Sequence, residues 1–238
     1  MKRYSVFLGV VMLVASQLSW AQTLNFDSGE EWKVSYDKKG ILLHTKKLEG
    51  EVIRAVKVAT TIKASIESAI FAITNVDQMA SWVPILESSE LLQSTDNNGK
   101  SISYLITDLP WPIKNRDVLY ENRTTYNEDK SEVYFYSSAF IDEELKSSHS
   151  SLVRMPSSQA LWRVKAIGKN LVEVELTAHA DPGGAIPKWF ANLVIVQGPK
   201  MTILNLRKLL ERESEEIAKK FDSKEVFGHD VKLTSLAN

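Results

Sequence analysis

The strongest constraint on the fold of this chain is a long succession of segments in which apolar and polar residues alternate. Near the end of the succession, for example, Val172, Val174 and Leu176 alternate with charged or hydroxyl residues. This period of two predicts an antiparallel sheet with one face on the core and one in water. The segments with this pattern are Glu90–Ser94, Ser101–Thr107, Val118–Tyr126, Val133–Ala139, Ser151–Met155, Leu161–Ile167 and Leu171–Ala180.

Three more strands and two helices are predicted ahead of these segments. β-branched and aromatic residues alternate with charged ones in Trp32–Tyr36, Ile41–Lys47 and Val52–Ile62, with turn residues between them. Apolar residues then recur at helical spacing in Ser65–Thr74, and Val76–Trp82 predicts a second short helix. The strands are therefore interrupted once by helices.

One long helical segment, Pro187–Phe221, is the candidate to cover the apolar face of this sheet. Its first half, Trp189–Leu210, is apolar over a wide arc, whereas Glu211–Lys220 is mostly charged. Pro199 follows Gly198 and removes a helical hydrogen-bond donor, so a bend is expected there. Two interpretations stay open: the bend wraps the helix over a curved sheet, or a kinked helix simply packs the core.

These elements predict one α+β domain, residues 22–221, in which a long C-terminal helix covers an antiparallel sheet. A composition of 44% hydrophobic and 25% charged residues supports a globular domain of this kind. Residues 222–238 lack a strong hydrophobic period, so this tail is a candidate for disorder.

The first 21 residues have the pattern of a secretory signal peptide. Lys2 and Arg3 precede the apolar run Val6–Ala15, and Ser19 and Ala21 have the spacing of a cleavage site. The alternative is a membrane anchor, but the run is shorter than the ~20 apolar residues that span a bilayer. We therefore expect cleavage near Ala21 and a periplasmic or secreted protein.

Composition excludes several classes of function. The chain has no cysteine, which excludes a disulfide and a thiolate metal site. Its net charge is −1, and loss of Lys2 and Arg3 with the leader makes it more negative, so nucleic-acid binding is disfavoured. None of the common hydrolase, metalloprotease, phosphate-loop or dinucleotide motifs occurs.

Two segments resemble motifs of the START (StAR-related lipid-transfer) domain family. Residues 111–117, Trp-Pro-Ile-Lys-Asn-Arg-Asp, resemble the family's P-x(2-3)-R-D segment at the start of a strand. Residues 181–192, from Asp-Pro-Gly-Gly to Trp-Phe-Ala-Asn, resemble the approach to its last helix. The resemblance covers nearly the whole chain after the leader. It implies a helix-grip fold, similar to Bet v 1, in which a curved antiparallel sheet wraps around the long C-terminal helix with a ligand tunnel between them.

The resemblance also implies a set of ligand-binding residues. Tyr104, Arg116 or Asn122 would hydrogen-bond a polar head group, although Arg116 and Asp117 could instead form a structural pair that ties the sheet to the turn at Asp181. Sterol-binding members have a carboxylate and an arginine that face each other in the tunnel. On the strands that flank the R-D segment, this chain has hydroxyl and amide side chains instead. The implied ligand-binding residues are Tyr104, Arg116, Tyr120, Asn122, Trp162, Leu176, Trp189, Leu193 and Val196.

The leading hypothesis is that the chain binds and transfers one hydrophobic ligand, such as a lipid, fatty acid or quinone, without metal or cofactor. It would act as a monomer with transient membrane contact. An alternative is an enzyme of the polyketide-cyclase kind, with His179 or Glu175 as base and His179 oriented by Asp181. A third hypothesis uses Glu211–Lys220 and the tail as an interaction surface.

Overall fold

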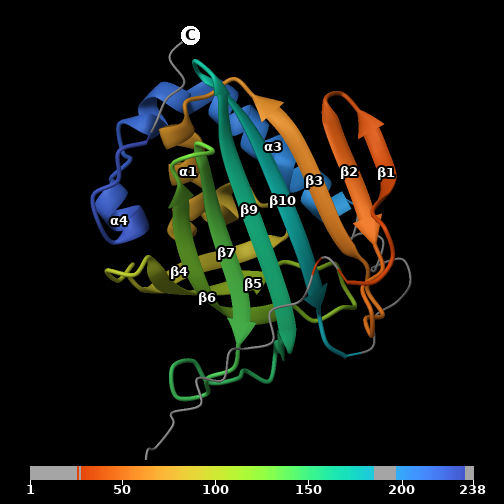
Figure 1. Ribbon diagram of the computed structural model, residues 1–238. Helices are drawn as coiled ribbons and strands as arrows, with labels where there is room; N and C mark the ends of the chain where they lie inside the picture. Colours follow the sequence, from red (N-terminus) through yellow and green to blue (C-terminus); the bar gives the residue numbers. More distant parts are fainter. Residues whose placement is uncertain (1–25, 27, 185–196, 234–238) are drawn as a thin grey trace, which may run out of the picture.

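A single curved sheet forms the body of the computed structural model, which describes residues 26, 28–184 and 197–233 (Figure 1). Its strand order is β1-β2-β3-β10-β9-β7-β6-β5-β4, with antiparallel neighbours, and the short β8 pairs with β6 in parallel. The strands are β1 (Lys33–Lys38), β2 (Ile41–Lys46), β3 (Ala55–Ile62), β4 (Leu86–Gln93), β5 (Lys100–Thr107), β6 (Arg116–Asn127), β7 (Glu132–Phe140), β8 (Val153–Arg154), β9 (Ser157–Gly168) and β10 (Leu171–Asp181).

Helices cover one face of this sheet. The described helices are α1 (Ile66–Thr74), the 3-10 helix η1 (Val76–Ser81), α3 (Gly198–Ala218) and α4 (Ser223–Phe227). Helix α3 passes behind β3, β9 and β10 in Figure 1 and packs against α1 and β3. Its buried residues Ile203, Leu206 and Leu210 join Ile70 of α1 and Val174 of β10 in one hydrophobic core. The core therefore lies between the sheet and the helices.

The observed elements confirm the α+β fold with a curved antiparallel sheet and a C-terminal helix. Some strands start at other residues than predicted. Strand β4 begins at Leu86 and β9 at Ser157, both earlier than expected, because polar residues extend the pairing beyond the alternating apolar run. Strand β3 begins only at Ala55, since Val52 lies in the preceding loop with 95% of its surface exposed.

The C-terminal tail differs from the prediction over residues 222–233. Asp222 caps α4 by accepting a hydrogen bond from the Lys224 amide, and Gly228 ends the helix with a positive φ of 79°. Phe227 is only 1% exposed and belongs to the hydrophobic core. Helix α4 has only five residues, and its buried residues are Val226 and Phe227. A segment this short does not show a helical hydrophobic period.

Other predictions concern residues outside the described part of the chain. The predicted signal peptide, residues 1–21, lies there, and so does the predicted helical segment up to residue 196. The described helix α3 begins at Gly198, so the predicted bend at this position stays a prediction. In the part that the structure describes, no helix combines the length and the apolar character needed to cross a membrane.

Candidate functional site

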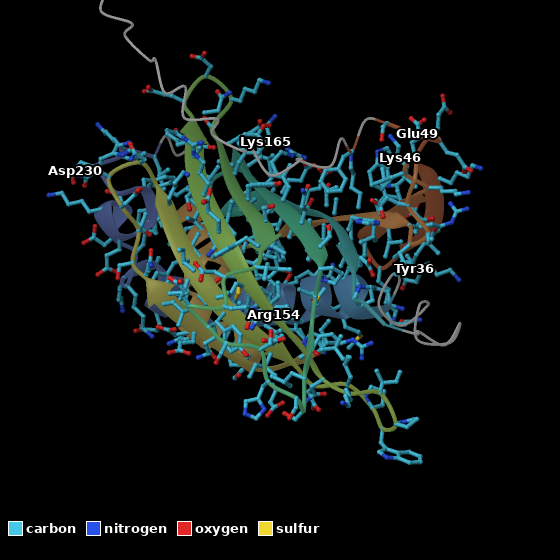
Figure 2. All side chains as sticks on the ribbon, turned by 90° about the horizontal axis from the view of Figure 1, so that it is seen from below. Tyr36, Lys46, Glu49, Arg154, Lys165 and Asp230 are labelled. Carbon is cyan, nitrogen blue, oxygen red and sulfur yellow. The ribbon has the colours of Figure 1, made fainter. Side chains whose placement is uncertain are left out.

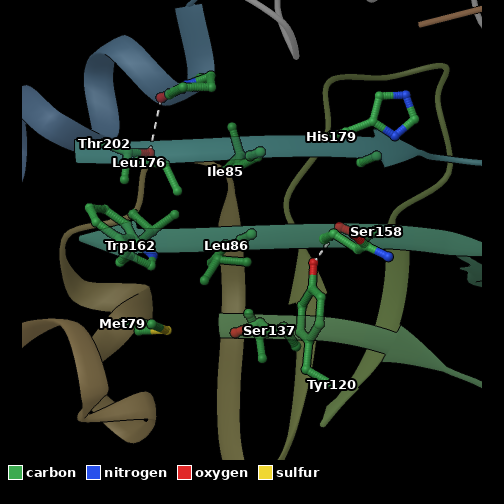
Figure 3. A pocket seen from close by; sticks show the side chains of 18 of the residues that line it. Met79, Ile85, Leu86, Tyr120, Ser137, Ser158, Trp162, Leu176, His179 and Thr202 are labelled. Atoms are coloured by element: carbon green, nitrogen blue, oxygen red, sulfur yellow. Dashed lines mark hydrogen bonds between the residues drawn. The ribbon is translucent and has the colours of Figure 1, made fainter. Parts of the chain in front are cut away.

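A cavity of about 220 Å³ lies between the inner face of the sheet, η1 and the start of α3 (Figure 3). Strands β3, β5, β6, β7, β9 and β10 contribute one wall, and η1 and the residues leading into β4 contribute another. The described lining residues are Ile53, Arg54, Val56, Val76, Met79, Val83, Ile85, Leu86, Ser103, Leu105, Tyr120, Asn122, Phe135, Ser137, Ser158, Gln159, Ala160, Trp162, Leu176, Ala178, His179, Ala180, Gly198, Pro199 and Thr202.

One end of the cavity is apolar. Trp162 of β9 is paired across the sheet with Leu176 of β10 on one side and with Phe135 of β7 on the other, and all three are buried. The ring of Trp82 meets that of Trp162 edge-on, with centroids 6.1 Å apart. Met79 of η1 lies at the same end in Figure 3. This end of the cavity is therefore suited to the hydrocarbon part of a ligand.

A hydrogen-bonded group centred on Asn122 contributes Ser103, Asn122 and Ser137 to the polar part of the cavity lining. The Asn122 side chain is 2% exposed, and its Nδ2 donates to Ser103 Oγ at 2.9 Å and to Ser101 Oγ at 3.4 Å. Its Oδ1 accepts from Ser137 Oγ at 2.8 Å. Strand pairing explains the arrangement, because Asn122 lies opposite Ser101 on β5 and Ser137 on β7. All four side chains are uncharged.

Tyr120 and Ser158 form a second polar pair, further from the apolar end. Their hydroxyl oxygens are 2.6 Å apart, and Figure 3 shows this bond at the opposite end from Trp162. Burial raises the pKa of the Tyr120 phenol, and the hydrogen bond with Ser158 opposes this only in part. Tyr120 therefore keeps its proton and is a hydroxyl donor or acceptor, never an anion, at neutral pH.

Permanent charge is nearly absent from this site. Among the described lining residues, Arg54 alone carries one. Its side chain is 42% exposed, and one guanidinium nitrogen lies 4.0 Å from a carboxylate oxygen of Glu30. The charge of Arg54 is thus hydrated and partly balanced by Glu30 at the edge of the cavity.

The match to known families covers most of the chain. The START domain family matches residues 21–216. The chain belongs to this family. Membership implies that the START domain binds a hydrophobic ligand, and the matches do not identify which one.

Relatives and solved structures agree with this assignment. PA1579, an uncharacterized protein of Pseudomonas aeruginosa, is 26% identical over 77% of this chain and 88% of its own length. The phosphatidylcholine transfer protein of Rattus norvegicus is 21% identical over 72% of this chain and 79% of its own. A STAR-related lipid transfer protein fragment from Xanthomonas axonopodis is 27% identical, with a TM-score of 0.68, over 76% of this chain and 99% of that fragment. Human STARD10, 17% identical over 87% of this chain and 84% of its own, shares the fold with a TM-score of 0.67.

The START domain brings four of the predicted ligand-binding residues together. Tyr120, Asn122, Trp162 and Leu176 all line the cavity. Three others, Trp189, Leu193 and Val196, lie outside the described residues. The remaining two, Tyr104 and Arg116, are not among the described lining residues, and their neighbours explain why.

Tyr104 lies on the outer face of the sheet, since Ser103 and Leu105 on either side of it line the cavity. Its hydroxyl donates to Asp117 Oδ2 at 2.9 Å. Arg154 donates to the same oxygen through Nε at 2.9 Å, and its Nη2 lies 2.8 Å from that oxygen in an ion pair. Burial, with the Asp117 hydrogen bond, raises the pKa of Tyr104 to about 12. Asp117 thus pairs with Arg154, not with Arg116.

Arg116 ties the start of β6 to the turn after β10. The Arg116 side chain donates from Nε to the Pro182 carbonyl and from Nη2 to the Gly183 carbonyl, each at 3.2 Å. The residue is 3% exposed. The structural alternative for Arg116 thus has direct contacts in its favour, although the acceptors are backbone carbonyls of the turn and not the Asp181 carboxylate.

The groups of the enzyme hypothesis do not form a dyad. His179 Nε2 lies 3.0 Å from the Ile53 carbonyl, while Asp181 accepts from the Gly183 amide at 2.9 Å. Glu175 lies 3.7 Å from Arg163, which also binds Glu173. Across the described ranges no hydrogen bond joins His179 to Asp181, and no group of three potential metal-ligating side chains occurs.

Sequence reasoning missed Ser137 and Ser158 as cavity residues. Both lie on the inner face of their strands, two residues from Phe135 and four from Trp162 respectively. The alternation of β7 and β9 carried this signal. Serine also occurs on solvated strand faces, so the residue type alone does not mark a cavity position.

Proposed function

We propose that this START domain is a non-catalytic carrier that binds one apolar ligand in the described cavity and transfers it. The observation that carries the proposal is the apolar end at Trp162, Leu176 and Phe135, which faces the helices across a cavity. Each CH₂ group moved there from water contributes ~0.8 kcal/mol. The names of the Rattus and Xanthomonas relatives, both transfer proteins, support transfer in addition to binding.

The setting of this carrier is part of the proposal. The leader pattern of residues 1–21 supports export to the periplasm or the exterior. There, a monomer with an apolar cavity would move its ligand between membranes through water. Detection of the full-length chain in cytosolic fractions only, after expression in a Gram-negative host, would contradict export.

One exposed side chain supports transient contact with a membrane. Trp111, between β5 and β6, is 90% exposed, and Lys114 follows in the same loop. Tryptophan partitions to the interface between hydrocarbon and water, where its ring and its N–H are both satisfied. We propose that this loop touches the donor or acceptor membrane during exchange.

Native mass spectrometry of the purified chain tests the carrier proposal, followed by denaturing extraction of any bound molecule. A stoichiometric apolar compound is expected. In Ala178→Phe the new ring occupies the cavity, so the bound compound should fall to a small fraction of its amount. The control is Val52→Phe at an exposed position, which should retain the compound. An empty chain that also ignores a fluorescent lipid panel would refute the proposal.

A further inference from the structure

The lining of the cavity changes from polar to apolar along the strands, so a ligand with one polar group has a preferred orientation. Ser158 and Trp162 on β9 both line it and are four residues apart, about 13 Å along a strand. Ser158 and Tyr120 lie at one end, Ser137 between, and Trp162 at the other (Figure 3). A ligand with one polar group lies with that group near Ser158 and with its hydrocarbon against Trp162.

Hydroxyl hydrogens remain available at the polar end. The Asn122 amide is fully engaged by Ser101, Ser103 and Ser137. Ser103 accepts one of these bonds, and its own hydroxyl hydrogen is donated to no residue in the described ranges. The Tyr120–Ser158 pair has two hydroxyl hydrogens, and one bond between two oxygens uses only one. The site thus offers unused donors to a ligand oxygen.

Negative charge would be poorly solvated among these groups. The described polar lining residues are hydroxyls and amides, apart from His179, whose Nε2 lies 3.0 Å from the Ile53 carbonyl, and Arg54, which is hydrated and faces Glu30. Among the described lining residues, a carboxylate or phosphate moved into this cavity would lose its hydration without gaining a buried side chain of permanent positive charge, and this is costly.

We propose that the ligand is an uncharged lipid with an ester or ketone carbonyl, whose oxygen accepts hydrogen bonds from the hydroxyl groups of Ser103 and the Tyr120–Ser158 pair. The inference rests on the proposed carrier function and deepens it. It assigns the hydrocarbon to the Trp162 end and the carbonyl to the end where Tyr120 pairs with Ser103 across β5 and β6. Free fatty acids and other anionic lipids are then disfavoured ligands.

A matched pair of competitors tests this selectivity. Dodecanoate and its methyl ester have the same hydrocarbon, and at pH 8 only the ester is uncharged. Each is titrated against a fluorescent apolar dye bound to the purified chain. Because burial of an ionised carboxylate is penalised, the ester should bind at least about tenfold more tightly than the acid.

Two variants test where the carbonyl group of the ligand binds. Removal of a donor leaves the ligand oxygen unpaired, so Ser103→Ala and Tyr120→Phe should each weaken ester binding by about tenfold and leave dodecanoate nearly unchanged. Ser101→Ala is the matched control, because Ser101 also contacts Asn122 but does not line the cavity. Circular dichroism checks that each variant is folded, and Tyr120→Phe serves if Ser103→Ala does not fold.

The remaining outcomes separate this inference from the carrier function. Equal or tighter binding of dodecanoate overturns the inference and leaves the carrier function intact, and loss of that binding in Arg54→Met would place an anionic head group at Arg54. Dye binding with no competition from either compound also overturns it. A chain that does not bind the dye, and that carries no apolar compound in native mass spectrometry, fails as a carrier altogether.

Discussion

At the scale of single residues, Arg116 and Asp117 serve two separate parts of the fold although they are adjacent. Their side chains leave β6 in opposite directions, as strand geometry requires. Arg116 binds the turn carbonyls at Pro182 and Gly183, and Asp117 binds Arg154 on the other face. A motif of adjacent opposite charges therefore does not form one ion pair here.

Arg116→Met should lower the free energy of unfolding by about 2–4 kcal/mol, because two buried carbonyls lose a charged donor. Urea denaturation of the purified variant measures this. Arg212→Met, at a side chain that is 71% exposed, is the control and should change the value by less than about 0.5 kcal/mol. An unchanged midpoint together with lost ligand affinity would assign Arg116 to the ligand and not to the turn.

At the scale of elements, the short helix α4 shows how a few contacts can order a segment with little periodicity. It buries Val226 and Phe227, and its end at Gly228 approaches the loop between β4 and β5 at Asp96. Gly228 has a φ of +79°, and a Cβ atom there would collide with the Asp96 carbonyl. Both backbone angle and space therefore require glycine.

Gly228→Ala should destabilise the chain by several kcal/mol more than Gly50→Ala. Gly50 has nearly the same φ, +78°, but a Cβ atom added there would have no neighbour within 4 Å, so its substitution costs only the left-handed backbone strain of about 1–2 kcal/mol. Thermal unfolding of both variants gives the comparison. Equal losses would mean that α4 moves away from Asp96 at little cost.

At the scale of the whole molecule, a cavity whose described lining has one permanent charge, that of Arg54, lies inside a charged exterior. Charged side chains such as Glu49 and Asp230 lie at the periphery in Figure 2. Trp111 is an exception on this surface, since most of its large apolar ring is in water. An apolar cavity together with an exposed tryptophan side chain suits the exchange of a ligand at a membrane.

Trp111→Ala should slow ligand transfer between vesicles several-fold while the affinity for free ligand stays the same, because the ring contributes interfacial binding and does not line the cavity. A fluorescence assay with donor and acceptor vesicles measures the rate. Val34→Ala, which removes an exposed apolar side chain on the edge strand β1, is the control. An unchanged rate would remove this loop from the exchange step.

Much of the architecture could be predicted from the sequence. Alternation in β10 and helical spacing in α1 are local, so each element could be recognised without its partners. The two START motifs then identified the family, and inward positions such as Trp162 and Asn122 followed from that resemblance.

What the tertiary structure alone decided is which side chains meet. The Asn122 group joins three strands, and Asp117 finds its partner Arg154 at a distance of 37 residues. Such pairings depend on strand register and on the curvature of the sheet, to which residues far apart in sequence contribute together. The sequence by itself therefore determined the fold and the apolar character of the site, whereas the polar end, and with it the chemistry of the ligand, depended on the folded sheet.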